Sequence, residues 1–205
     1  PNVLAAYFPW LSSIAISLQA GFWEECLFRA VPLAGAALLG QRYGRPRLWI
    51  AGAFLLQMII FGAAHANYPA QPAYARVVEL LVPSAVFGFL YLRFGLLPAI
   101  VMHFAYDVVW FAMPLFVAES PGLLIDQALV IALAFIPLAV PIIYRWKQGA
   151  WKTVEERDYN ASWQPAPEEA PPMQTQPIAQ PMERPGPARY AWMGAGLLGI
   201  GLSVY

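Results

Sequence analysis

Apolar runs of membrane-spanning length fill most of the first 144 residues and restrict what the chain can fold into. A helix needs about 20 consecutive apolar residues to cross a bilayer. Runs of this kind lie at residues 3–39, 48–66, 77–92, 96–116 and 123–144. The composition agrees, because 60% of the 205 residues are hydrophobic and 12% are charged. We predict an all-α, polytopic transmembrane helix bundle over residues 1–144.

The first run is too long for one straight span. At about 1.5 Å per residue it exceeds the thickness of a bilayer. We expect either one long, tilted helix or two pieces broken near Gly21, with Pro9 and Pro32 as kinks.

The chain changes character at residue 145. Residues 145–189 are rich in proline and poor in branched apolar residues, which is typical of a semi-extended, disordered linker. Residues 190–205 form a Gly-rich apolar run that we interpret as the start of a further, truncated transmembrane segment, for a total of about five to six membrane helices. Since the sequence begins at Pro1, we expect earlier transmembrane segments of the same protein to be missing.

Charge and cysteine content narrow the function classes. The formal net charge is +0, so the basic excess of a nucleic-acid-binding protein is absent. The single cysteine, Cys26, excludes an internal disulfide. The positive-inside rule makes one alternating set of connections cytoplasmic, and it carries Arg42, Arg45, Arg47, Arg93, Arg145, Lys147 and Lys152. Counting back along the helices from these connections sets the polar cluster described next toward the outer leaflet.

Three ionisable residues interrupt the first run in the stretch GFWEECLFRA: Glu24, Glu25 and Arg29. An ionised side chain at mid-bilayer costs about 2.5 to 3.5 kcal/mol, so such a cluster needs internal partners. Glu25 and Arg29 are four residues apart and share one helix face as a structural ion pair. Glu24 is rotated by about 100° from Glu25 and is left for the role of a general base. Solvation of all three at a helix end is the alternative.

The two histidines of the chain lie in separate apolar runs. The stretch FGAAH places Phe61 four residues before His65, and HFAYD places His103 four residues before Asp107. A single membrane histidine is often only an interhelical hydrogen bonder. Two histidines with carboxylates on three apolar helices instead offer a base, a water-orienting group and carbonyl-polarising donors.

The ordered motifs EECLFR, FGAAH and HFAYD resemble those of the CPBP intramembrane proteases, named for CAAX proteases and bacteriocin-processing enzymes and also called the ABI family. The resemblance covers about residues 11–113. It implies an integral membrane endopeptidase related to the CAAX prenyl endopeptidase, in a bacterial inner membrane, acting with lipid around it on a membrane-associated peptide or protein.

The resemblance also implies residue roles. Glu24 would deprotonate a water that His65 holds, His103 and Asp107 would stabilise the oxyanion, and Phe61 would serve packing. An ionised Asp107 would repel an oxyanion, so it would be protonated or would orient His103. Glu24, His65, His103 and Asp107 also make a plausible N/O ligand set for zinc, so the cofactor is either none or zinc. These four residues are far apart in the sequence and form no local metal-binding motif, so their spacing does not decide between zinc and no cofactor.

Two readings without catalysis stay open. One is a membrane protein of the bacteriocin self-immunity type that keeps the motifs for stability. The other is a proton or ion pathway, since acids and histidines lining a bundle also serve a relay.

Overall fold

The structure is a computed structural model that describes residues 2–67, 72–151, 153–156 and 159–160. Within these residues the chain is helical and has no strand. The helices are α1 (Pro9–Glu25), α2 (Val31–Tyr43), α3 (Pro46–Ala64), α4 (Ala73–Phe94), α5 (Leu96–Val117), α6 (Leu124–Ala134) and α7 (Ile136–Gln148). The expected all-α fold is therefore confirmed. Most of the proline-rich segment and all of the last apolar run fall at residues 161–205, outside the described residues.

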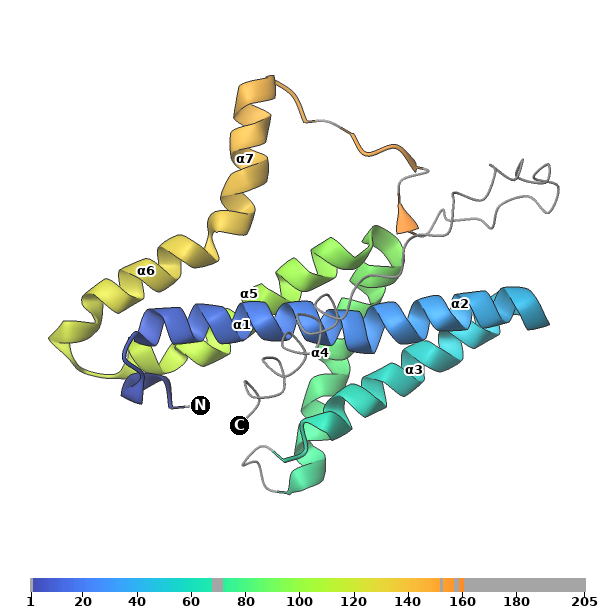
Figure 1. Cartoon of the computed structure of the whole chain (residues 1–205), viewed down its shortest axis with the longest axis horizontal. Helices are drawn as coiled ribbons and strands as arrows, with labels where there is room; N and C mark the ends of the chain where they lie inside the picture. Colours follow the sequence, from blue (N-terminus) through green and yellow to red (C-terminus); the bar gives the residue numbers. More distant parts are fainter. Residues whose placement is uncertain (1, 68–71, 152, 157–158, 161–205) are drawn as a thin grey trace, which may run out of the picture. The chain divides into compact units, whose positions relative to one another are not determined.

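From Pro9 onward the first apolar run forms one continuous rod, which a 3₁₀ turn at Val3–Ala5 precedes. A π-helical segment, Cys26–Ala30, joins α1 to α2, and Figure 1 shows the two helices running end to end. The chain does not break at Gly21, which lies inside α1. Pro9 occupies the first turn of α1, where proline is compatible with a helix because its missing N–H matters least. Pro32 instead follows the π-helical segment inside the continuous rod, so its missing N–H removes one hydrogen bond from the helix next to the wider turn. The observed irregularity is the wider turn between the helices.

Three helices in the described part of the chain, α3, α4 and α5, are long and apolar enough to cross a membrane. They match the predicted runs at 48–66, 77–92 and 96–116. The run at 123–144 was expected as one span, but it is divided into α6 and α7, which meet at an angle of 50° at Phe135. Pro137 explains the bend, because it has no N–H to donate to the preceding turn and disfavours helical backbone at residue 136. Counted as one broken span, this pair is the fourth.

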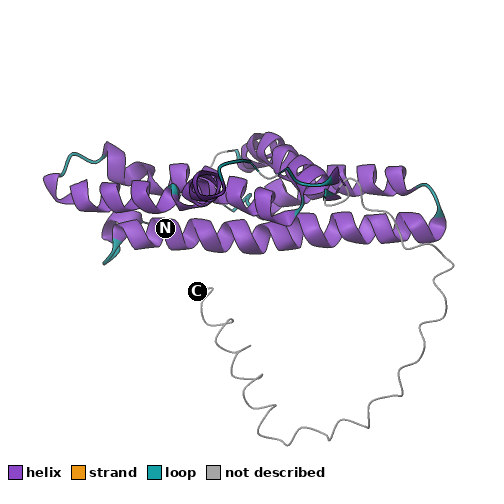
Figure 2. Cartoon of the chain, turned by 90° about the horizontal axis from the view of Figure 1, so that it is seen from above, coloured by secondary structure: helices purple, strands orange, loops and turns teal. Residues whose placement is uncertain are grey.

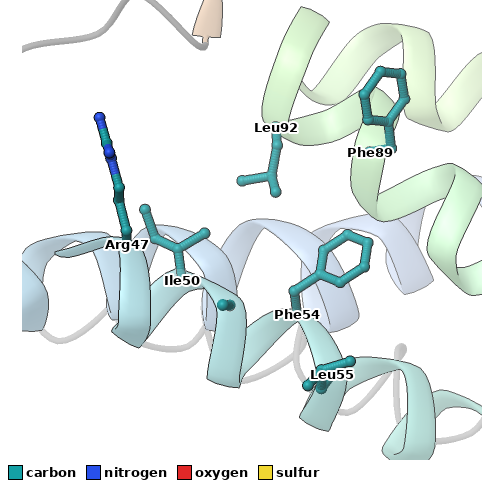
Figure 3. A pocket seen from close by; sticks show the side chains of 7 residues that line it. Arg47, Ile50, Phe54, Leu55, Phe89 and Leu92 are labelled. Carbon is teal, nitrogen blue, oxygen red and sulfur yellow. The ribbon is translucent and has the colours of Figure 1, made fainter. Parts of the chain in front are cut away.

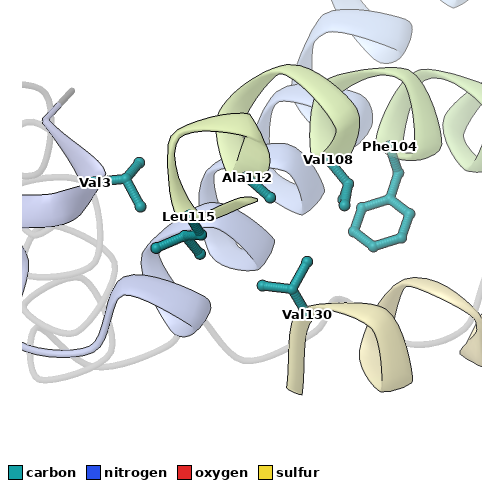
Figure 4. Close-up of a cluster of buried hydrophobic side chains, with 6 residues drawn as sticks. All are labelled: Val3, Phe104, Val108, Ala112, Leu115 and Val130. Atoms are coloured by element: carbon teal, nitrogen blue, oxygen red, sulfur yellow. The ribbon is translucent and has the colours of Figure 1, made fainter. Parts of the chain in front are cut away.

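The helices pack as a chain of neighbours. α1 contacts α5 and α6, α2 contacts α3, α3 contacts α4, and α4 contacts α5. Figure 2 gives the second view of this arrangement. The main apolar core lies where α1, α5 and α6 meet, and it contains Val3, Phe104, Val108, Ala112, Leu115 and Val130 (Figure 4). α1 and α5 approach closely because Gly21 has no side chain: a Cβ there would lie 3.1 Å from the backbone nitrogen of Phe104.

Asp126 anchors the start of α1. Its Oδ1 accepts the backbone N–H of Trp10 at 3.1 Å, in the first turn of α1. That N–H has no carbonyl partner within the helix, and a carboxylate is favourable at a helix N-terminus. The one acidic residue of the sixth helix thus ties α6 to α1.

Candidate active site

The structure brings together all seven residues selected from the sequence. Glu24 and Glu25 end α1, Arg29 lies in the π-helical segment, Phe61 and the capping residue His65 belong to the end of α3, and His103 and Asp107 lie in α5. Three contacts join Glu24 and Asp107 to the two histidines. Oε2 of Glu24 lies 3.5 Å from Nε2 of His65 and 3.7 Å from Nε2 of His103, and that same nitrogen lies 3.5 Å from Oδ2 of Asp107.

The two neighbouring glutamates point in different directions. The side chain of Glu24 is 25% exposed, whereas that of Glu25 is 0% exposed. Consecutive residues of a helix are rotated by about 100°, so the two adjacent carboxylates point into different surroundings. Glu24 faces the accessible side of the cluster, and Glu25 faces its sealed interior.

Glu25 pairs with Arg29 inside the protein. Oε1 of Glu25 lies 3.0 Å from Nη1 of Arg29, and both side chains are fully buried. Arg29 also donates from Nη2 to the hydroxyl of Ser84 at 3.1 Å, and Ser84 in turn donates to Oε1 of Gln57 at 2.9 Å. Partner groups are essential here, because an isolated buried charge is strongly unfavourable.

Aromatic rings cover the guanidinium of Arg29. Its Cζ lies 4.1 Å from the ring centroid of Phe61 and 5.2 Å from that of Phe87. A cation over a ring face is attracted by the negative π surface, more strongly when water is excluded. Phe61 also lies beside His65, at 4.7 Å between ring centroids. The phenylalanine of the FGAAH motif therefore contacts both the buried cation and the histidine four residues later.

His103 is held on one side by a carboxylate and on one face by a ring. Its Nδ1 lies 2.7 Å from Oε1 of Glu25, and its ring stacks on Phe87 at 4.6 Å with an interplanar angle of 12°. An ionised carboxylate beside Arg29 only accepts hydrogen bonds, so this contact favours the His103 tautomer that has its proton on Nδ1. Nε2 is thereby left to face Glu24 and Asp107.

His65 is oriented in the same way. Its Nδ1 lies 2.7 Å from the backbone carbonyl of Phe61, which accepts the Nδ1–H and turns Nε2 toward Glu24. His65 follows the last residue of the α3 span. The interaction with the Glu24 carboxylate is the main reason why the pKa of His65 is raised, against the opposing effect of its partial burial.

Oε2 of Glu24 is the atom on which these groups converge. It is buried as an atom and has no hydrogen-bond partner in the described structure, although two Nε2 atoms face it. A carboxylate oxygen and a neutral imidazole Nε2 are both acceptors and cannot bond to each other. A donor between them, such as a water molecule, or a proton on an imidazole satisfies the arrangement.

Comparison with protein families gives a match over residues 6–109 to the type II CAAX prenyl endopeptidase Rce1-like model. The chain belongs to this family. The match spans all three motifs, from EECLFR to HFAYD, and is consistent with an integral membrane protein of a protease family. No significant match was found among curated proteins or among solved structures.

A metal centre was one alternative for this Rce1-like site. Among the described residues, no group of three or more His, Cys, Asp or Glu side chains is arranged so that it could hold a metal ion. The four predicted ligands are close together, but as placed they do not form such a set.

Sequence reasoning missed part of this Rce1-like site. Ser84 and Phe87, both on α4, are buried against Arg29 and His103, and the contact between Glu25 and His103 spans 78 residues. Gln57 and Ser84 could have been suspected as polar residues within apolar spans. Phe87 gave no signal, because a phenylalanine in a membrane helix is ordinary.

Proposed function

We propose that the protein is a membrane endopeptidase in which Glu24 activates a water molecule to hydrolyse a peptide bond at or near the membrane. The observation that carries the proposal is the unsatisfied Oε2 of Glu24, faced by Nε2 of His65 and of His103 at 3.5 and 3.7 Å. A water between Oε2 of Glu24 and Nε2 of His65 donates one proton to each of them. Its lone pair is then directed toward a substrate carbonyl.

The first chemical step forms a carbon–oxygen bond. The water oxygen attacks the carbonyl carbon, its proton passes to Oε2 of Glu24, and the carbonyl electrons move to the oxygen. His103 stabilises this oxyanion when it carries protons on both ring nitrogens, since it then donates Nδ1–H to Glu25 and Nε2–H outward. Asp107, 3.5 Å from that Nε2, orients it or, when protonated, adds a second donor.

The second step breaks the carbon–nitrogen bond. The oxyanion electrons return to form the carboxyl group, the amine leaves, and the proton stored on Glu24 passes to it. Glu24 regains its charge and binds the next water. The buried pair of Glu25 and Arg29 does not take part in these transfers and serves to position His103.

The family name points to the substrate class that we propose: the C-terminal region of a membrane-associated protein bearing a prenylated CAAX sequence. Membrane lipid surrounds the enzyme and presents such a substrate. The resemblance to the family implies a bacterial inner membrane. The bias of basic residues toward one set of connections favours a site nearer the outer leaflet, whereas the resemblance to prenyl endopeptidases implies a site that opens to the cytosol.

The test is hydrolysis by the purified protein in liposomes, with a farnesylated CAAX peptide in water enriched in ¹⁸O. The expected product carries one ¹⁸O atom in its new carboxyl group, and Glu24→Gln slows its formation by about 10² to 10⁴-fold. Glu119→Gln, which changes an exposed carboxylate outside the site, is the matched control and retains activity. Label-free product, or full activity of Glu24→Gln, would remove Glu24 as the base.

A further inference from the structure

A groove with mainly apolar walls lies between α3 and α4, away from the candidate active site. Its volume is about 520 Å³, and seven residues line it: Arg47, Ile50, Ala51, Phe54, Leu55, Phe89 and Leu92 (Figure 3). The five residues from α3 follow the spacing of one helix face, and their span along the axis is about 12 Å. The groove is therefore a slot along the helix, open to the surroundings of two membrane-spanning helices.

The shape of the slot follows from small residues. Phe54 packs tightly on α4 because Gly88 has no side chain: a Cβ there would lie 2.7 Å from Cε2 of Phe54. Ala51 lines the slot between Ile50 and Phe54 with a single methyl group, which leaves space there. Leu55 and Phe89 are 61% and 59% exposed, so apolar surface remains available along the slot.

One end of the slot carries a cation. Arg47 is exposed and lies in the first turn of α3, and within the described part of the chain it has no carboxylate or hydrogen-bond partner. Arg93, near the same end of α4, instead lies 3.7 Å from Glu156. No side chain caps the start of α3, so the positive end of its dipole adds to the Arg47 charge.

A slot with branched and aromatic apolar walls and a cation at its mouth complements an anionic lipid. Membrane helices prefer to pack through small residues that allow close backbone approach, and of the seven lining residues only Ala51 is small. A packed helix would also leave Arg47 needing an anion in an apolar setting. A phospholipid satisfies both demands, since its acyl chain is apolar and its phosphate is negative.

We propose that this groove binds an anionic glycerophospholipid, with one acyl chain along Ile50, Phe54, Leu55, Phe89 and Leu92 and the phosphate on Arg47. Leu55 is ten residues before His65, which is about 15 Å along α3. The lipid is thus bound outside the candidate active site, and its binding does not depend on peptidase activity.

The test measures lipids that stay bound to the full-length protein after purification, by native mass spectrometry. The protein is equilibrated in mixed micelles with equal amounts of dioleoyl phosphatidylglycerol and dioleoyl phosphatidylcholine. Wild-type protein retains phosphatidylglycerol preferentially. Arg47→Gln lowers this preference by about fivefold, the effect of one interfacial cation, and Ala51→Phe fills the slot and removes both lipids.

Arg42→Gln is the matched control, because it removes a nearby cation that does not line the slot and leaves the preference unchanged. Inorganic phosphate does not displace the bound lipid, since it lacks the acyl chain. The proposal is overturned if wild-type protein retains the two lipids equally or retains neither. It is also overturned if Arg42→Gln acts as strongly as Arg47→Gln, or if Ala51→Phe binds lipid like the wild type.

Discussion

Nδ1 of His103 lies 2.7 Å from Oε1 of Glu25, which also lies 3.0 Å from Nη1 of Arg29. One carboxylate oxygen therefore links the buried cation of the π-helical segment to the histidine of α5. The orientation of His103 toward Glu24 depends on this contact, although Glu25 itself is inaccessible to a substrate. Substitution of Glu24 and substitution of Glu25 should therefore have different effects.

The first prediction separates these glutamates. Glu24→Gln should lower peptidase turnover by about 10² to 10⁴-fold, the usual contribution of a general base, with normal thermal stability. Glu25→Gln should lower both turnover and thermal stability, since it leaves Arg29 buried without its counter-charge. We expect it to lower the free energy of unfolding by about 3 to 5 kcal/mol. Turnover and thermal unfolding in detergent check both variants. Equal destabilisation by the two substitutions would contradict the division.

The second prediction concerns Asp107. If Asp107 acts as a protonated donor, Asp107→Asn supplies a donor that needs no proton. The variant should then preserve activity and should exceed the wild type at high pH, where a carboxylic acid loses its proton. Turnover across pH and metal content of the same samples are the measurements. Joint loss of activity and of bound zinc in Asp107→Asn would instead assign Asp107 to a metal site.

The third prediction is a shift in the titration of His65. Since the Glu24 carboxylate raises the pKa of His65, Glu24→Gln should lower that pKa toward or below its ordinary value. As the pH rises, His65 therefore loses its proton at a lower pH in the variant than in the wild type. Histidine-selective NMR measures this directly, because the chain has two histidines and His65→Gln identifies the signal. An unchanged titration would mean that Glu24 and His65 do not interact.

The fourth prediction tests the polar contacts of α4. Ser84→Ala should lower the free energy of unfolding by about 1 to 3 kcal/mol, because it leaves Nη2 of Arg29 and Oε1 of Gln57 buried without partners. Ser17→Ala is the control. Ser17 is equally buried, but its hydroxyl donates to the Ser13 carbonyl of its own helix, so its loss should cost much less. Similar melting temperatures for the two variants would count against the network.

The fifth prediction uses two glycines of α3. A Cβ on Gly62 would lie 2.8 Å from Cα of Val77 and 2.9 Å from its carbonyl oxygen, whereas a Cβ on Gly52 meets nothing within 4 Å. Gly62→Ala should force α4 away near His65 and lose about 1 to 3 kcal/mol of stability. Gly52→Ala should gain about 0.5 to 1 kcal/mol, since alanine favours helix. Thermal unfolding of both variants tests the close approach of α3 and α4.

The lengths of the apolar runs and the pairs of polar residues four positions apart predicted much of this architecture. Helices α3, α4 and α5 followed from runs long enough to cross a bilayer, since backbone groups in lipid must bond within their own helix. Residue pairs such as His103 and Asp107 could be placed on one face because helix geometry is local. The cost of charge in an apolar run singled out Glu24, Glu25 and Arg29.

Other features depend on contacts that no local pattern contains. The link from Glu25 to His103 and the stacking of Phe87 on that histidine join separate helices, so only their packing reveals them. The bend at Phe135 was missed for a different reason. Proline in a membrane span is tolerated in some contexts and breaks the helix in others, and the outcome depends on neighbouring helices.

The π-helical segment determines how the buried face of α1 lines up with the buried face of α2. Buried positions recur every fourth residue along α1 at Ser13, Ser17, Gly21 and Glu25, and continue at Arg29 in the segment and Leu33 in α2. Removing one residue between Glu25 and Leu33 would turn everything beyond it by about 100° and present Leu33 to lipid instead of α3. The number of residues across Cys26–Ala30 therefore determines which side chains of α2 pack against α3 and which face lipid.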